Sequence, residues 1–203
     1  MMRKFKFFLN LEKEEQWLSD MEKKGYRIVD TSFGYKFRST DPEEVTIKSD
    51  YRKFKSQEDF IDYCTLFEDS GWKHIAGKKN SGHQYFKKVG ESHDDIFSDG
   101  LSKAGKFKRM SNDFLHLSIG YLPILLVLLM TGIIDIRAFV NPKHLYLTPS
   151  LWEMTGSSFW FAFLFETPFA FLRAVLWSFL PILIIGALIY AFRAQLQYKK
   201  SMS

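Results

Sequence analysis

The stretch Phe114–Ile134, which reads FLHLSIGYLPILLVLLMTGII, decides what kind of protein this is. A second stretch, Phe169–Phe192, reads FAFLRAVLWSFLPILIIGALIYAF and contains one charged residue, Arg173. A helix needs about 20 apolar residues to cross the roughly 30 Å hydrocarbon core of a bilayer, and both stretches reach that length. The sequence therefore predicts two membrane-spanning helices in the C-terminal half of the chain.

The N-terminal half has a different composition. The 203-residue chain contains 28 Lys and Arg and 23 Asp and Glu, and most of them precede residue 111. Such a change marks a domain boundary, and the polar part has room for one small core. The net charge of +5 comes from basic residues interspersed with acids, which is typical of a solvated surface, so we expect no nucleic-acid partner. The single cysteine, Cys64, excludes an internal disulfide.

Two segments of the polar half resemble each other. Met21–Arg27 reads MEKKGYR and Phe67–Lys73 reads FEDSGWK, and their glycines are 46 residues apart (71 − 25). The same offset relates Asn10 to Ser56, which are both residues favoured at helix N-caps. The glycines stand where each helix should end, because glycine tolerates the left-handed backbone of a C-cap. We interpret the polar half as a duplicated unit.

Each unit is expected to be strand–helix–strand–strand, because an aromatic strand precedes each cap and two further strands follow each glycine. The predicted fold class is α+β. The two units, residues 1–43 and 44–90, would pair into one mostly antiparallel sheet with both helices on one face, as a two-layer sandwich. Cys64 falls on the predicted core face of the second helix, where we expect it to be a buried small apolar residue.

The remaining boundaries follow from the apolar stretches. We expect a polar and basic linker over 91–110, a first span over 111–135, an extracytoplasmic segment over 136–167, a second span over 168–193 and a tail over 194–203. The favoured interpretation of Pro149–Phe165 is an interfacial helix lying in the outer leaflet, ended by Glu166 and Pro168. The alternative is one long helix from about Ser157 with a kink at Pro168.

Basic residues predict the orientation. Four lie just before the first span and three follow the second, whereas the segment between the spans has two. Because loops rich in Lys and Arg stay in the cytoplasm, both termini are expected to be cytoplasmic in a multi-pass protein of the cell membrane. The residues expected to set the topology and meet lipid headgroups are Lys103, Lys106, Lys108 and Arg109. The polar stretch Gly90–Gly105 favours a flexible tether between domain and membrane.

No residue pattern indicates chemistry. The five histidines show no pair at the spacing of a metal site, and the glycines follow no phosphate-binding pattern. His93 with Asp94 and Asp95 is better explained as part of a solvated linker. We expect no catalytic residue, no metal and no cofactor, and hence no enzyme. Four aromatic residues at repeat-related positions could pack between helix and sheet or form a ligand or partner surface: Trp17, Tyr26, Tyr63 and Trp72.

Residues 3–90 with the two-span tail resemble an uncharacterised bacterial membrane family called domain of unknown function 2812. The resemblance rests on the basic-aromatic opening Arg3–Phe8, the unit formed by Trp17 and Met21–Tyr26, and the tail. It implies no activity, although genes of this family near PadR-like regulators would hint at membrane stress or drug response. A doubled strand–helix–strand–strand unit is also similar, at the level of fold alone, to the ligand-binding domains of GyrI-like multidrug sensors.

Two functions remain in competition. The favoured one is a non-enzymatic integral membrane protein whose cytoplasmic domain binds a protein partner, a second copy or a small ligand. The alternative is a small-molecule or membrane-stress sensor that reports to a membrane complex or to a transcriptional regulator.

Overall fold

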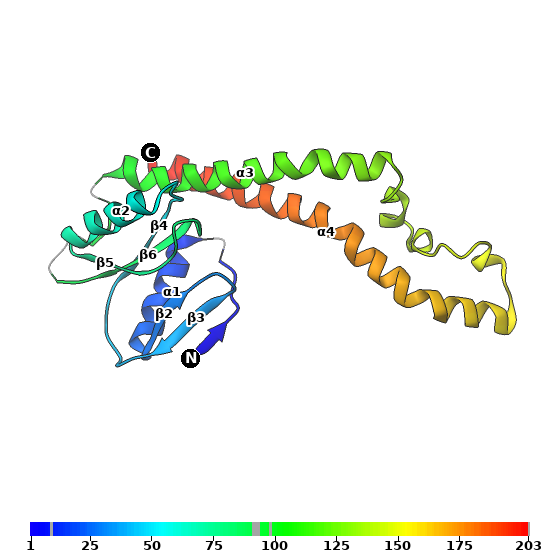
Figure 1. Ribbon diagram of the computed structural model, residues 1–203, viewed down its shortest axis with the longest axis horizontal. Helices are drawn as coiled ribbons and strands as arrows, with labels where there is room; N and C mark the ends of the chain where they lie inside the picture. Colours follow the sequence, from blue (N-terminus) through cyan, green and yellow to red (C-terminus); the bar gives the residue numbers. More distant parts are fainter. Residues whose placement is uncertain (9, 91–93, 98, 203) are drawn as a thin grey trace. The chain divides into compact units, whose positions relative to one another are not determined.

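The computed structural model describes residues 1–8, 10–90, 94–97 and 99–202. It consists of two compact units. The N-terminal unit is Met1–Asn112 together with Tyr190–Ser203, and the second unit is Asp113–Ile189. The predicted class is confirmed: a mixed α+β region is followed by two long apolar helices (Figure 1).

The N-terminal unit contains the expected order of elements twice. The first set is β1 (Met2–Lys4), α1 (Leu11–Lys23), β2 (Tyr26–Asp30) and β3 (Tyr35–Ser39). The second set is β4 (Ile47–Tyr51), α2 (Gln57–Asp69), β5 (Trp72–Ala76) and β6 (His83–Lys88). The predicted strand–helix–strand–strand unit is therefore confirmed in both halves.

The prediction of one continuous sheet is wrong. The strands form two separate antiparallel sheets, ordered β1-β3-β2 and β4-β6-β5. The edge strands β2 and β5 lie near each other without a ladder between them. Each has a register shift at the same place, after Ile28 in β2 and after His74 in β5. Such an irregularity bends and twists an edge strand, which opposes further pairing at that edge.

The helix ends follow the sequence signals. The Asn10 side chain accepts hydrogen bonds from the backbone of Glu12 and Lys13, and Ser56 accepts one from Asp59. Gly25 and Gly71 follow the C-caps with φ angles of +78° and +82°. Both predicted caps and both predicted stops are confirmed, because an L-residue with a side chain rarely adopts that backbone conformation.

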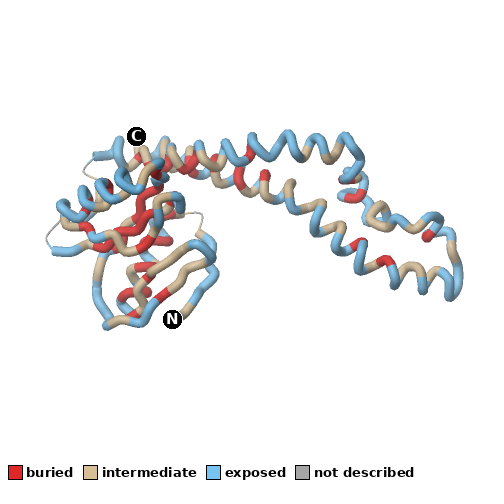
Figure 2. The backbone as a smooth tube through the Cα atoms, viewed as in Figure 1, coloured by how far each residue is buried: buried red, intermediate tan, exposed pale blue. Residues whose placement is uncertain are grey.

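The two helices are buried differently (Figure 2). Helix α1 contacts β2 of its own sheet and β4 of the other, and its core cluster joins Leu18 and Phe37 to Tyr85 of the second half. Helix α2 contacts β5 and covers a second cluster built around Trp72 and Phe86. Helix α1 therefore lies inside the unit and α2 lies on its surface.

Two long helices follow, α3 (Gly100–Met130) and α4 (Gly156–Met202). Between them are the short turns η1 (Ile136–Phe139), η2 (Pro142–Leu145) and η3 (Leu151–Glu153). Both helices are long and apolar enough to cross a membrane. Only 6% and 17% of their most apolar windows is buried, whereas the core helix of a soluble protein would be mostly buried.

Two boundary predictions need correction. Helix α3 begins at Gly100, inside the stretch expected to be a flexible tether. The separate interfacial helix over 149–165 does not form, and α4 runs through Pro168 without a break, as in the alternative interpretation. Glu166 does not end a helix. Its carboxylate instead accepts hydrogen bonds from the backbone N–H groups of Leu147 and Thr148, which ties the connecting segment to α4.

Candidate binding cleft

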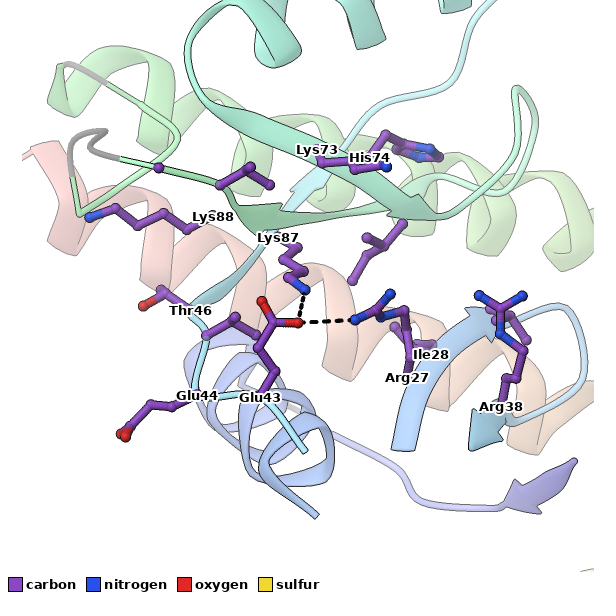
Figure 3. Close-up of a pocket in the computed structure, with 15 residues that line it drawn as sticks. Arg27, Ile28, Arg38, Glu43, Glu44, Thr46, Lys73, His74, Lys87 and Lys88 are labelled. Atoms are coloured by element: carbon purple, nitrogen blue, oxygen red, sulfur yellow. Dashed lines mark hydrogen bonds and ion pairs between the residues drawn. The ribbon is translucent and has the colours of Figure 1, made fainter. Parts of the chain in front are cut away.

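A cleft of about 710 Å³ lies along the facing edges of β2 and β5 (Figure 3). Both halves of the duplicated unit contribute to it, together with the segment of residues 40–46 that connects them. Its charged lining comes mainly from Arg27, Arg38, Glu43, Lys73, Lys87 and Lys88. Because neither half alone has these groups, the cleft is a product of the paired arrangement.

Glu43 lies between two of these cations (Figure 3). Its Oε2 atom is 3.2 Å from an Arg27 guanidinium nitrogen and also accepts a hydrogen bond from Lys87 Nζ. The hydrogen bond from Lys87, with the positive charges of Lys87 and Arg27, lowers the pKa of Glu43. Since its side chain is 47% exposed, this carboxylate is a solvent-accessible anion held in a cationic site.

Glu22 forms the buried side of the same cluster. It comes from the last turn of α1, and its side chain is completely buried. Its Oε1 atom accepts a hydrogen bond of 2.6 Å from Arg27 Nε and lies 3.7 Å from Lys87 Nζ. Its Oε2 atom has no hydrogen-bond partner among the described residues. Glu22 therefore holds Arg27 and Lys87 in position from the buried side of the cluster, and Glu43 contacts the same two cations from the solvent side.

The cleft has an excess of positive charge. One further lining cation is already paired, because Lys88 contacts Asp94 at 2.9 Å. The lining carboxylate Glu44 is paired with Lys23, which lies outside the lining. The exposed side chains of Arg38 and Lys73 make no ion pair within the described residues. A surplus of exposed cations around the Glu43 carboxylate is suited to binding an anion, since Arg and Lys recognise carboxylates and phosphates.

A second polar cluster crosses the interior of the unit. Glu14 of α1 is 3% exposed, and its Oε1 atom accepts hydrogen bonds from the hydroxyls of Tyr35 at 2.7 Å and Tyr85 at 2.5 Å. Burial and the nearby Glu14 carboxylate raise the pKa of both tyrosines. These hydroxyls therefore remain protonated donors, and they join the two halves through one carboxylate.

The predicted basic cluster lies on the first turns of α3 and faces carboxylates of its own unit. Lys106 is buried, 3.3 Å from Glu15 and bonded to the Ser49 carbonyl. The Arg109 guanidinium bonds Asp50 at 2.8 Å and the Tyr51 carbonyl at 2.7 Å.

The other two members of that cluster are placed differently. Lys103 pairs with Asp95 at 2.7 Å, and Lys108 lies 5.9 Å from the ring of Tyr198. The sequence identified these four residues but not the carboxylates that three of them meet. Because Lys106 and Arg109 are paired with Glu15 and Asp50 of the α+β core, the start of α3 is attached to this core, unlike the flexible tether predicted there.

The four predicted aromatic residues are not brought together. Trp17 and Tyr26 pack against the first core cluster, whereas Tyr63 and Trp72 belong to the second. None of the four lines the cleft. The Tyr63 hydroxyl donates a 2.7 Å hydrogen bond to Asp50, so this residue also has a packing role.

Cys64 is half-buried beside the second cluster, and burial raises the pKa of its thiol to about 11. His93 lies outside the described residues. Within the described ranges, no group of three or more His, Cys, Asp or Glu side chains is arranged to hold a metal ion.

The three buried glutamates of α1 were missed, although the sequence carried a signal for them. The buried positions of the helix are Leu11, Glu14, Glu15, Leu18, Met21 and Glu22. Their spacing is that of an apolar helical stripe, with glutamate at three of its positions. Charge at stripe positions indicates that a partner must be supplied from elsewhere in the fold.

Comparison with known families agrees with the resemblance noted in the sequence. The model of the family described as protein of unknown function DUF2812 matches residues 10–119, more than half of the chain, so the chain belongs to this family. The match begins just before α1, so it leaves out β1, and it continues through the second half into α3. No curated protein and no solved structure matches the chain.

Proposed function

We propose that this chain is a non-enzymatic integral membrane protein whose cytoplasmic N-terminal unit binds a small anionic ligand in the cleft between β2 and β5. The observation that carries the proposal is the Glu43 carboxylate held by Arg27 and Lys87 at an exposed cationic site. A ligand carboxylate or phosphate would take the place of Glu43 on the same two cations.

Membrane insertion is supported by the exposure of the apolar surfaces of α3 and α4. The cytoplasmic orientation is supported by the basic residues near the two cytoplasmic ends. Lys108 and Arg193 are not paired with carboxylates in the described part of the chain, so they remain available as topology signals. In this arrangement the segment between the spans is extracytoplasmic.

The orientation is tested with single cysteines in a Cys64→Ala background. Ser150→Cys should react with an impermeant thiol reagent in intact cells, whereas Ser201→Cys should react only after the cells are opened. The reverse pattern of labelling would reject the cytoplasmic placement of the N-terminal unit.

The cleft is tested by thermal unfolding of the full chain in detergent, with inorganic phosphate and citrate as probes. Arg38→Glu with Lys73→Glu should abolish the stabilisation by these anions, because the two unpaired cations are lost and like charges repel the ligand. A matched control with the same change of net charge is Lys13→Glu with Lys55→Glu, at exposed positions away from the cleft.

A sharper variant is Glu43→Gln, which removes the internal anion and retains the side-chain shape. It should bind phosphate or citrate several-fold more tightly at low ionic strength, since the ligand no longer competes with a carboxylate. Unchanged binding in Glu43→Gln, together with equal binding by the two double variants, would show that these anions do not use the cleft.

The sensor function is the second candidate, and the attachment of α3 to the core favours it. Ligand binding that displaces Glu43 would act on Arg27, Lys87 and Glu22, and Glu22 is on the same helix as Glu15, the partner of Lys106. Hydrogen exchange of residues 100–112 with and without phosphate distinguishes the candidates. A sensor should show ligand-dependent protection there, whereas a simple binding module or a scaffold for a protein partner should not.

A further inference from the structure

The N-terminal segment presents an unusual exposed aromatic surface. Residues 3–8 read RKFKFF, and the side chains of Phe5 and Phe7 are 70% and 71% exposed. Phe33, from the turn between β2 and β3, is 69% exposed and packs edge-to-face on Phe5 at 5.4 Å. Three exposed phenylalanines close in the fold are costly in water and indicate a contact with an apolar phase or partner.

Cations accompany these rings. The Arg3 guanidinium lies 5.7 Å from the Phe33 ring, and Lys6 Nζ lies 4.8 Å from the Phe8 ring. Lys4 Nζ donates a hydrogen bond to the Met21 sulfur, at 3.5 Å. In the described part of the chain none of the three cations forms an ion pair with a carboxylate, so their charge is available to an external anion. We refer to Arg3, Lys4, Phe5, Lys6, Phe7 and Phe33 as the N-terminal aromatic surface.

This surface is attached to the end of the second apolar stretch. The Phe7 ring packs edge-to-face on Tyr190 of α4 at 5.0 Å, and the Tyr190 hydroxyl donates a 2.9 Å hydrogen bond to the Phe8 carbonyl. Tyr190 stands three residues before Arg193 (193 − 190), the first charged residue after the apolar stretch. Tyrosine at such a place marks the depth of the headgroup layer. The contact therefore holds Phe7 at the level where α4 leaves the hydrocarbon core.

We propose that the N-terminal aromatic surface docks on the bilayer, with the three phenylalanine rings in the interfacial layer and the three cations on anionic lipid phosphates. The inference rests on the membrane insertion given under the proposed function. Aromatic rings combined with Lys and Arg are the side chains that bind an anionic leaflet, because the rings enter the interfacial layer and the cations attract anionic headgroups. The charge of this surface and its continuity with the apolar stretch at Tyr190 both select a lipid surface over a protein partner.

The test uses the full chain in proteoliposomes, in a Cys64→Ala background with one new cysteine carrying an environment-sensitive fluorophore. Labels at Phe7→Cys and Phe33→Cys are compared with labels at Ile61→Cys and Leu66→Cys, exposed positions on α2. Quenching by lipids that carry a spin label near the headgroup should be at least two-fold stronger at residues 7 and 33 than at residues 61 and 66. A label at Leu176→Cys, inside the apolar stretch of α4, reports insertion itself.

Lipid charge and basic residues supply the second arm. Quenching at residue 33 should decrease at least two-fold when phosphatidylglycerol is replaced by phosphatidylcholine, or when Arg3, Lys4 and Lys6 are changed to Gln. Quenching at 176 with none at 7 and 33 would overturn this inference and leave the proposed function intact. No quenching at 176 would overturn both. Burial of residues 7 and 33 that depends on protein concentration and not on lipid would assign the surface to a second copy of the chain and reject the lipid.

Discussion

Helices α1 and α2 occupy the same place in their respective halves, yet one is internal and the other is a surface layer. Three positions of α1 that are buried glutamates correspond, at an offset of 46 residues, to Phe60, Ile61 and Glu68 of α2. Ile61 is 54% exposed, and Glu68 is exposed as well. The duplicated unit is therefore symmetric in its chain path and asymmetric in what it buries.

The difference between the helices shows that the buried glutamates of α1 depend on polar and charged partners outside α1, many of them in the second half of the unit. Glu14 is bonded to Tyr85, Glu15 to Ser49 and Lys106, and Glu22 to Arg27 with Lys87 nearby. The matching positions of α2 have no such partners: Ile61 and Glu68 are exposed, and Phe60 is half-buried against the second core cluster. A buried carboxylate is stable only with such partners, because an unpaired buried charge is strongly unfavourable.

The largest expected effect comes from the matched pair Glu22→Gln and Glu68→Gln. The first should lower the free energy of unfolding by about 3 kcal/mol, because it removes the buried charge that holds two cations. The second should change it by less than about 0.5 kcal/mol, as usual for an exposed position. Thermal or chemical unfolding of the full chain in detergent measures both. Equal losses in the two variants would mean that α1 and α2 are buried alike, against the comparison.

The two glycines that follow the C-caps should show a smaller difference in their loss of stability. Gly25→Ala is expected to cost about 2 kcal/mol, and Gly71→Ala about 1 kcal/mol, since both require a positive φ. The additional cost at Gly25 arises because a Cβ atom there would lie 2.8 Å from the backbone oxygen of Thr40. The same unfolding measurement applies, and a larger loss at Gly71 than at Gly25 would contradict the role of Thr40.

The N-caps should behave almost identically in the two halves. Asn10→Ala and Ser56→Ala should each cost about 1 kcal/mol, the usual value for loss of a capping side chain. Asn10 should be slightly the more costly, because it accepts from two backbone N–H groups and Ser56 from one. Asn10→Asp and Ser56→Thr serve as controls that retain a capping oxygen and should preserve stability.

The smallest effect is a difference in pH dependence. Residues 1–46 contain no histidine, whereas His74 lies beside the cleft in β5, where burial lowers its pKa from 6.5. Its neighbours are Gln84, which bonds the ring at 3.1 Å, and the charged Glu68. The folded chain then holds fewer protons than the unfolded chain, so stability falls as the pH drops below 6.5 toward the folded pKa.

His74→Gln removes this titration. The melting temperature of the variant should decrease less than that of the unchanged chain between about pH 7 and 5.5. Asn80→Gln, which exchanges one uncharged amide for another at an exposed turn position, is the control and should leave the pH profile unchanged. A profile that is the same in all three proteins would exclude His74 as the titrating group.

The sequence predicted the features that depend on local chemistry. Asn10, Ser56, Gly25 and Gly71 act within a few residues of themselves, and the two apolar stretches are long enough to be recognised by composition alone. The split into two sheets, the cleft and the pairing of Lys106 and Arg109 depend on contacts between residues far apart in the sequence. A basic residue before an apolar stretch can act as a topology signal and can also form an ion pair. The sequence alone does not reveal that Lys106 meets Glu15 and that Arg109 meets Asp50.

The same long-range bonds set the order in which the chain can complete itself during synthesis. Glu15 can meet Lys48, at 3.5 Å, early in synthesis, but it lacks its second cation until Lys106 has left the ribosome, 91 residues after Glu15. The apolar stretch of α3 begins soon after, at Phe114. The hydrogen bond to the Phe8 carbonyl forms later still, because its donor, the Tyr190 hydroxyl, is made 182 residues after Phe8. The N-terminal unit can therefore reach its final contacts only after both apolar helices have been made, so its completion is linked to the synthesis of the chain that follows it.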